Sequence, residues 1–377
     1  MTDAAASRDR RSLREVAAVF LKLGVIGFGG PAAHVALMRR ELVERRRWLD
    51  EDRFLELFGA ASLIPGPSST ELGMMLGYER AGWPGLLVAG TCFIVPAMLL
   101  VLAIAWAYVR YGSLPQTDWI LYGIGPVIIA VILDAFWQLG RRALTSIPLA
   151  AVAVTVMVLY LLGVDVVVLL FGAAILVMLG RNIVRMRAEP QGVIPILPLL
   201  AAAEAPLRSV FLEFLKLGAV VYGSGYVLLA FLRSDLVEHL HWIGESRLID
   251  AVAVGQVTPG PVFTTATFIG YLVAGLPGAL VATAGIFLPA FALSAIVFPL
   301  LPRLRRSPWA SAFLTGVTVS GLALMAGVTF QLGRVVIVDA FTAVVAIVAF
   351  VVLRRFQPNS AWLVLGGAVV GLIARGP

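Results

Sequence analysis

Two proline- and hydroxyl-rich stretches are the part of this 377-residue chain best suited to chemistry: PGPSST at 65–70 and TPGPVFTTAT at 258–267. Proline is tolerated in the first turn of a helix, where free N–H groups and the positive end of the helix dipole favour an anion. Nearby hydroxyls add hydrogen-bond donors. We therefore predict two half-helix N-termini that bind an anion through Pro65, Gly66, Pro67, Ser68, Ser69, Thr70, Thr258, Pro259, Gly260, Pro261, Thr264 and Thr265.

A glycine-rich break precedes each stretch, FGGP at 28–31 and YGSG at 222–225. Glycine lets a backbone approach a ligand closely because no side chain intervenes. The alternative is that glycine and proline mark only kinks or close helix packing, as they often do in membrane helices. Their recurrence at matching places favours a binding cavity, and it adds Phe28, Gly29, Gly30, Gly223, Ser224 and Gly225 to the predicted site.

The only two lysines, Lys22 and Lys216, each lie about six residues before a glycine break, within apolar sequence. A cation near the centre of a bilayer costs about 3 kcal/mol, so it needs a partner or a cavity. One interpretation makes the lysines counter-charges for an anionic substrate. The other lets each side chain extend to the headgroups. The sequence leaves both open.

Two carboxylates also lie in apolar segments, Glu71 directly after PGPSST and Asp134 within 119–139. They are candidates for proton coupling, and structural pairing is the alternative. His239 and His241 have no firm third ligand, so no metal site and no cofactor are expected. The single cysteine, Cys92, excludes a disulfide framework.

The elements that must position these residues are membrane helices. The chain is 60% hydrophobic and 14% charged, with a mean hydropathy of +0.95, which excludes a soluble globular protein. We predict an all-α polytopic membrane protein in the lipid bilayer, because apolar segments reach the roughly 17–25 residues that a spanning helix needs. These segments are 84–109, 119–139, 277–301, 311–332 and 335–353, with shorter ones at 147–162, 164–180 and 360–374. Four others, 15–38, 54–79, 209–232 and 248–272, are interrupted by the breaks.

An internal repeat accounts for the paired breaks. FLKLG at 20–24 returns at 214–218, and Pro65-Gly66-Pro67 returns at Pro259-Gly260-Pro261. After the loss of one residue, QLGR at 138–141 returns at 331–334. We predict a basic tail (1–14), a first repeat (15–187), a linker (188–207) with a membrane crossing as one option, and a second repeat (208–377).

The arginines indicate that the repeats are inverted. Loop 39–53 is arginine-rich whereas its counterpart is not, and the bias reverses between 110–118 and 302–308. This pattern also predicts a cytoplasmic N-terminus and explains the net charge of +7 without a nucleic-acid partner. Inverted repeats with discontinuous helices are typical of secondary transporters, in which substrate binds between the repeats.

The chain resembles the chromate ion transporter family in its long, two-domain form. The resemblance rests on FLKLGVIGFGGPAAHVALMRRELV, IPGPSSTELGMMLGYERAGWPGLLVAG and their second-half counterparts YGSGYVLLAFLRSDLV and HWIGESRLIDAVAVGQVTPGP, and it covers about residues 14–372. It implies export of chromate across the bacterial inner membrane, driven by the membrane potential or a proton gradient, and hence chromate resistance. Sulfate is the chemically similar alternative cargo.

Carried over by position, the family motifs of the first domain fall on Phe28, Gly29, Gly30, Pro31 and Pro65-Gly66-Pro67. Those of the second domain fall on Gly223, Gly225, Thr258 and Pro259-Gly260-Pro261. Gly27 stands where members often have serine, and Ser224 where they often have glycine. Three rival functions are a carrier for another inorganic anion, an anion channel and a membrane-embedded enzyme. The chain has no H-E-x-x-H or Walker motif, so we expect no enzyme. A homodimer is an open expectation.

Overall fold

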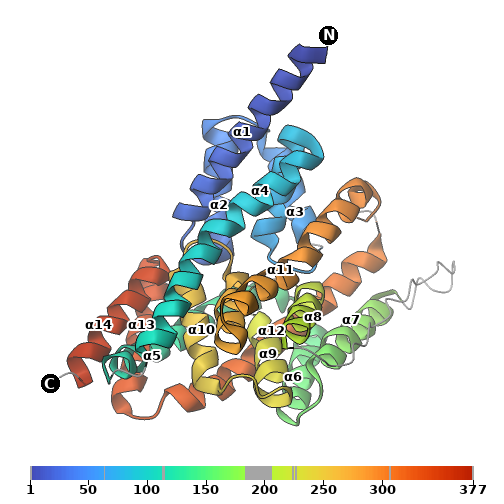
Figure 1. Cartoon of the computed structure of the whole chain (residues 1–377). Coiled ribbons are helices and arrows are strands. Elements are labelled where there is room, and N and C mark those ends of the chain that lie inside the picture. The colour runs from blue at the N-terminus through green and yellow to red at the C-terminus, as the bar shows by residue number, and fades with distance from the viewer. Residues whose placement is uncertain are drawn as a thin grey trace.

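The computed structural model describes residues 2–62, 64–112, 115–182, 206–222, 225, 227–304 and 307–375, which are almost entirely helical. The first repeat contains α1 (Thr2–Ile26), α2 (Gly30–Met38), the π-helix η1 (Arg39–Arg45), α3 (Glu51–Ala61), α4 (Ser68–Tyr111), α5 (Pro115–Ala143), α6 (Ile147–Leu161) and α7 (Val166–Asn182). The second contains α8 (Pro206–Val220), α9 (Leu228–Leu232), the π-helix η2 (Arg233–His239), α10 (Glu245–Val257), the 3-10 helix η3 (Val262–Thr264), α11 (Thr265–Leu304), α12 (Pro308–Val336), α13 (Ala340–Phe356) and α14 (Ser360–Arg375). Helices α1–α7 correspond in order to α8–α14 (Figure 1).

Four helices in the described part of the chain are long and apolar enough to cross a membrane: Ser68–Tyr111, Gln116–Ala143, Val262–Phe298 and Pro308–Val336. They contain the predicted spans 84–109, 119–139 and 311–332 and most of 277–301. The predicted start of the span 335–353 is wrong. Helix α12 continues to Val336, and α13 begins only after Asp339, whose carboxylate accepts the Thr342 amide at 2.8 Å in a capping box.

The four interrupted segments are indeed discontinuous. Helix α1 ends before Gly29 (φ 104°), and α3 is separated from α4 by Gly66 (φ 128°). In the second repeat Gly260 (φ 91°) separates α10 from η3. A positive φ of this kind favours glycine, so these breaks follow directly from the sequence. Residues 223 and 224, between α8 and α9, lie outside the described residues, as does nearly all of the linker.

Helices α4 and α11 each contain a sharp turn. At Ala81–Gly82 the backbone leaves helical geometry, and Ala274–Gly275 repeats these dihedral angles within a few degrees. Each helix folds back on itself there, so that Gly77 lies against Gly85, and Gly270 against Gly278, with no room for a Cβ between them. The first arms, residues 68–80 and 265–273, therefore lead away from the PGP turns, and the second arms return.

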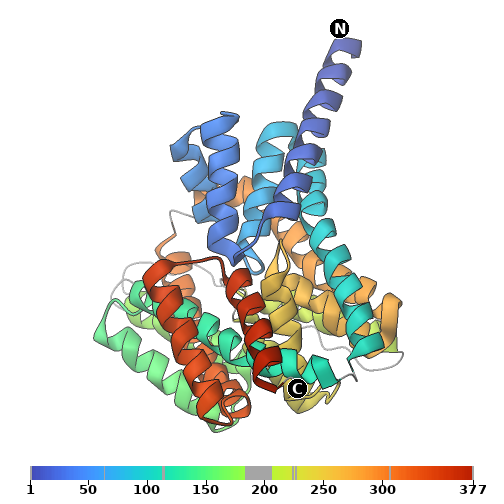
Figure 2. The ribbon, with the colours of Figure 1, turned by 90° about the vertical axis from the view of Figure 1, so that its left-hand side faces the viewer.

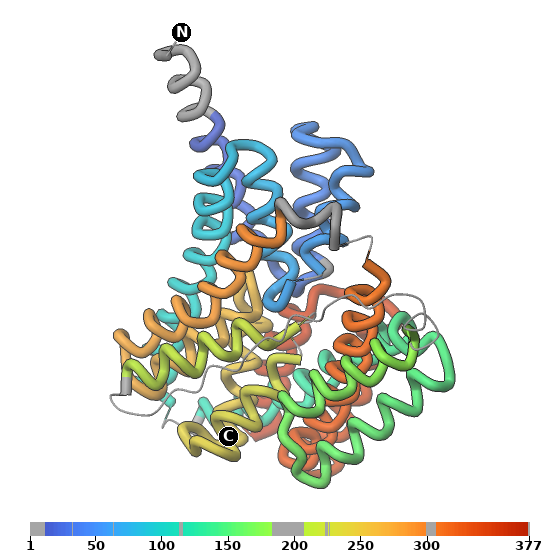
Figure 3. Tube along the Cα trace, turned by 90° about the vertical axis from the view of Figure 1, so that its right-hand side faces the viewer, coloured from blue at the N-terminus to red at the C-terminus, as the bar shows by residue number. Residues whose placement is uncertain are grey.

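The packing of α1 against α4 is repeated by that of α8 against α11 (Figure 3). Gly24 lies against the Phe93 carbonyl, and Gly218 at the equivalent position lies against the backbone of Ile286. Helices α4 and α11 also pack against each other and join the two repeats.

The last helices of each repeat are exchanged. Helix α5 packs against α13 and α14 of the second repeat, and α12 packs against α6 and α7 of the first (Figure 2). Small residues allow this close contact: Gly123 lies on the backbone of Gly367, and Gly316 lies on that of Ala174. These two pairs are equivalent in the repeat, so the exchange is reciprocal.

Candidate functional site

The tips of the interrupted helices meet at the interface between the repeats. The Gly66 amide donates to the Val221 carbonyl oxygen at 2.7 Å, which we call the first joint. The Gly260 amide donates to the Gly27 carbonyl oxygen at 2.8 Å, which we call the second joint. Gly27 and Val221 occupy equivalent positions, as do Gly66 and Gly260.

Such reciprocal contacts are what an approximate two-fold axis between the repeats produces. These contacts also occupy two of the backbone amides that the sequence analysis assigned to anion binding. Gly66 and Gly260 donate to protein carbonyls, so a ligand beside the tips must be bound by other donors.

A cavity of about 710 Å³ lies beside the tips of the first repeat, between α5, α12 and the turn before α14. Of the predicted site residues, Phe28, Gly29, Ser68, Ser69 and Asp134 line it. Its other polar groups are Ser62, Gln138, Arg142, Tyr222, Thr318, Gln357, Asn359 and Ser360. Within the described lining, Arg142 is the one cation and Asp134 the one carboxylate.

Some of these groups are held in place by hydrogen bonds within the protein. Asn359 accepts the Ala361 amide through Oδ1 at 3.0 Å, and its side-chain amide lies beside Gly29. Asp134 is held by Gln138 Nε2 at 2.6 Å and by Arg354 Nη1 at 3.4 Å. Sequence reasoning missed Asn359 and Arg142 because they come from exchanged elements or a helix end rather than a repeated motif.

The remaining predicted residues lie outside this cavity. Thr258, Thr264 and Thr265 donate their hydroxyls to backbone carbonyls three or four residues earlier, at 2.7–2.9 Å. Also absent from the lining are Gly30, Pro65, Gly66, Pro67, Thr70, Gly225, Pro259, Gly260 and Pro261. Gly223 and Ser224 are outside the described residues. The cavity is therefore built on the tips of one repeat, with Tyr222 as the contribution from the other repeat's glycine-rich break.

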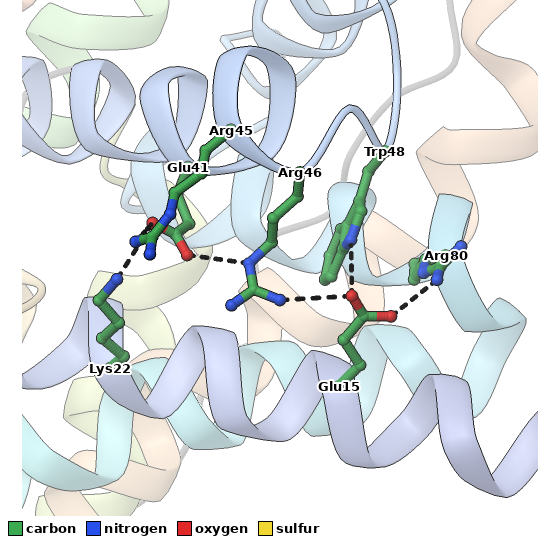
Figure 4. A network of polar contacts seen from close by, with 7 residues as sticks. All are labelled: Glu15, Lys22, Glu41, Arg45, Arg46, Trp48 and Arg80. Atoms are coloured by element: carbon green, nitrogen blue, oxygen red, sulfur yellow. Dashed lines mark hydrogen bonds and ion pairs between the residues drawn. The ribbon is translucent and has the colours of Figure 1, made fainter.

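The two lysines form ion pairs away from the cavity. Lys22 Nζ lies 3.1 Å from Glu41 Oε2, within a network that also joins Arg45, Arg46 and Glu15 (Figure 4). Burial alone would raise the pKa of Glu41, but hydrogen bonds from Arg46 and Lys22 lower it to about 2. The network fixes α1 to η1.

The second repeat reproduces this pairing. Lys216 Nζ lies 2.9 Å from Asp235 Oδ2, and Asp235 occupies the repeat position of Glu41. Lys216 also lies 2.7 Å from Glu213 Oε1. Both lysines thus connect the first helix of a repeat to its π-helix, an interpretation that the sequence did not offer.

Glu71 is fully buried beneath the first joint. Its Oε1 lies where a Cβ on Gly66 would be, and both carboxylate oxygens have no hydrogen-bond partner among the described residues. Its counterpart Thr265 is neutral and bonded to the Val262 carbonyl. A buried unpaired carboxyl of this kind is stable only when neutral or compensated, which keeps Glu71 a candidate for proton binding.

A second cavity of about 590 Å³ shares Ser62, Arg142, Leu314 and Thr318 with the first. Its further lining includes Arg181, whose Nη1 donates to Thr315 Oγ1 at 3.2 Å. The described lining contains two arginines, five hydroxyl side chains and no carboxylate. This composition suits an anion approaching the first cavity.

No cluster of three metal-ligating side chains occurs among the described residues. His241 Nδ1 donates to the Val237 carbonyl at 2.8 Å, and His239 lies near Ser234 and Asp235. A different histidine, His34, lies at the tips; it is buried against Ser69 and Gly27. Sequence reasoning missed it, although it stands six residues after Phe28 in FGGPAAH.

Comparisons with known proteins agree with this architecture. A family model described as Chromate transporter matches residues 14–178 and 208–372, once in each repeat. The chain is 36% identical to a chromate transport protein of Cupriavidus metallidurans, over 96% of this chain and 93% of the relative. It is also 36% identical to a probable chromate transport protein of Synechococcus elongatus, over 90% and 89% of the two chains, and 30% identical to a chromate transport protein of Pseudomonas aeruginosa, over 86% and 82%. No solved structure matches the chain.

Proposed function

The chain belongs to the chromate transporter family, and we propose that it exports chromate across the bacterial inner membrane as a secondary transporter. The observation that carries the proposal is the cavity beside the tips, which gathers serine, tyrosine and amide groups with one arginine inside an apolar helical protein. Relatives of nearly full length bear the name of chromate transport proteins, and this supports the choice of substrate.

We propose that the tetrahedral dianion binds at the start of α4. Ser68 and Ser69 lie in the first turn of this helix, Asn359 and Tyr222 face the same cavity, and Arg142 supplies positive charge. A helix N-terminus contributes about 0.3–1 kcal/mol to binding a negative charge, and up to about 2 kcal/mol when partly buried. Replacing the hydration of a dianion therefore needs several donors together, which this cavity supplies.

The anion enters this site through the second cavity. Arg142 lines both cavities and Arg181 lines the outer one, so positive charge extends from the opening to the site. Clefts lined by one sign of charge raise the local concentration of the opposite ion.

We propose alternating access as the mechanism, supported by two equivalent repeats that meet at the two joints. Because the two joints are equivalent, the repeats can adopt two related conformations. In each conformation the site is open to one side of the membrane and closed to the other. With the N-terminus cytoplasmic, the inside-negative potential favours outward movement of negative charge by about 2.3 kcal/mol per charge per 100 mV. Glu71 and Asp134 are the carboxylates proposed for proton coupling. Glu71 is buried with no hydrogen-bond partner in the described part of the chain, and Asp134 lines the cavity.

Uptake of labelled chromate into inverted membrane vesicles tests the function, because export by the cell appears there as uptake. Saturable uptake above that of empty vesicles is expected, with competition by sulfate measuring selectivity. The double substitution Pro65→Ala with Pro259→Ala removes both rigid turns and should abolish uptake while the protein still inserts. Absence of saturable uptake by the native chain would overturn the proposal, and full uptake by the double variant would overturn the role of the half-helices.

A further inference from the structure

His34 connects the second joint to the substrate cavity. It lies on α2 with 1% of its surface exposed, and its ring is edge-on to Phe93 of α4. Its Nε2 lies 2.8 Å from the Gly27 carbonyl oxygen, and its Nδ1 lies 3.1 Å from Ser69 Oγ. Gly27 also accepts the Gly260 amide, and Ser69 lines the cavity.

These partners determine where the protons are. A carbonyl oxygen can only accept, so Nε2 carries a hydrogen and donates to Gly27. In the neutral ring Nδ1 then has no hydrogen, and it accepts the hydroxyl proton of Ser69. In this state the Ser69 hydroxyl presents only lone pairs to the cavity, so it cannot donate to an oxyanion.

A proton on Nδ1 reverses this arrangement. Nδ1 then donates to Ser69 Oγ, and the hydroxyl hydrogen of Ser69 is freed to donate into the cavity. The same proton places a positive charge one side chain away from the proposed site. No bond other than these hydrogen bonds needs to change, and the Gly27 contact persists because Nε2 remains a donor.

The bound anion is the charge that we expect to favour a proton on His34. The charged groups of the described cavity are Asp134 and Arg142, both on α5. On α4, Glu71 is buried two residues beyond Ser69; on α1, Lys22 is paired with η1 through Glu41. None of these charged groups is hydrogen-bonded to the imidazole, whose two nitrogens face Ser69 and Gly27, and the equivalent position in the second repeat is Leu228.

We propose that His34 takes up a proton when the oxyanion binds, so that the transported unit is a dianion together with one proton. The inference rests on the proposed anion site. By thermodynamic linkage, an anion that favours protonated His34 must itself bind more tightly as the pH falls. The net charge moved would then be one negative charge instead of two.

Calorimetry of chromate binding to the purified protein, in buffers of different ionisation enthalpy, measures proton uptake. We expect uptake by the native chain and a chromate affinity that rises up to about tenfold per pH unit, the limit for one linked proton. His34→Gln should remove the part of this pH dependence that comes from the protein. His239→Gln, at the exposed end of η2, should retain it. Protonation of chromate in solution contributes equally to every variant, so it cancels when the variants are compared. Equal proton uptake by His34→Gln would overturn the inference, as would its loss in Glu71→Gln but not in His34→Gln.

A spectroscopic measurement needs no substitution at the tips. In protein labelled at its three histidines, chromate should move one ring resonance, assigned through His34→Gln, to the doubly protonated form. Binding of chromate with that resonance unchanged would overturn the inference alone. Absence of any chromate binding would overturn the proposed function as well.

Discussion

The Gly66 amide donates to the Val221 carbonyl oxygen at 2.7 Å, tying the proline turn before α4 to the end of α8 in the other repeat. The same bond recurs between Gly260 and Gly27 at 2.8 Å. Two unwound segments thus satisfy each other's backbone groups inside an apolar protein, where unsatisfied groups would be costly. Movement of one repeat must therefore be transmitted to the other repeat through these joints.

Gly66→Ala should lower stability and abolish transport. At φ 128° a side chain is strained by about 1–3 kcal/mol, and the new Cβ would also displace the buried carboxylate of Glu71. Gly82→Ala is the matched control, since Gly82 also has a positive φ but faces open space. Thermal unfolding in detergent should show the larger decrease for Gly66→Ala. Equal decreases would mean that the contact with Glu71 is unimportant.

Replacing the lysines should change stability and leave chromate affinity intact. Lys22→Gln removes a half-exposed ion pair, worth about 0–1 kcal/mol, and Glu41 keeps Arg45 and Arg46. Lys216→Gln should cost more, because Glu213 and Asp235 are largely buried and lose this cation. Thermal unfolding and the KM for chromate uptake measure the two effects. A KM raised tenfold by either substitution would instead favour the counter-charge interpretation.

Arg142→Gln should raise the KM for chromate by at least about tenfold and affect kcat less. Arg142 lines both cavities, and a charge-assisted hydrogen bond contributes about 1.5–3 kcal/mol to binding. Arg141→Gln is the control, because Arg141 is next to Arg142 in the chain but lines neither cavity. Uptake rates at several chromate concentrations provide the measurement. If both substitutions raise KM equally, the effect comes from general surface charge.

Gly123→Ala and Gly316→Ala should each destabilise the exchanged helix contacts by about 1–3 kcal/mol, because the added methyl group meets backbone on the facing helix. Gly172→Ala, also within an apolar helix but facing open space, should be neutral or slightly stabilising. Thermal unfolding compares the three variants. The exchange of helices would be in doubt if all three behaved alike.

Acid should weaken the contact between α1 and η1. The pKa of Glu41 is lowered to about 2 in the folded chain, so its contribution to stability is complete above the unfolded value near 4.5. That contribution is lost as the pH falls from about 4.5 to 2. Melting temperatures over this range should decline less steeply in Glu41→Gln than in the native chain. An unchanged slope would show that other carboxylates dominate.

Local chemistry explains what could be predicted. Glycine and proline at residues 28–31 and 65–67 interrupt helices whatever the tertiary packing. The length of the apolar segments predicts α5 and α12. The predicted binding residues remain a prediction. Ser68, Ser69 and Gly29 line the cavity, whereas the threonines at 264 and 265 donate to their own backbone. A hydroxyl in a helix has this local alternative, and the sequence alone does not decide between the two.

By itself, then, the sequence determined the repeat, the breaks and the apolar helices, because these depend on residues that are neighbours along the chain. Tertiary structure decided which tips meet, which acid each lysine pairs with, and the exchange of α13 and α14 onto α5. It also brought His34 to Ser69 and Asn359 to Gly29, two contacts between separate elements. Such contacts depend on how distant helices pack in three dimensions, and the spacing of residues along one chain carries little information about that packing.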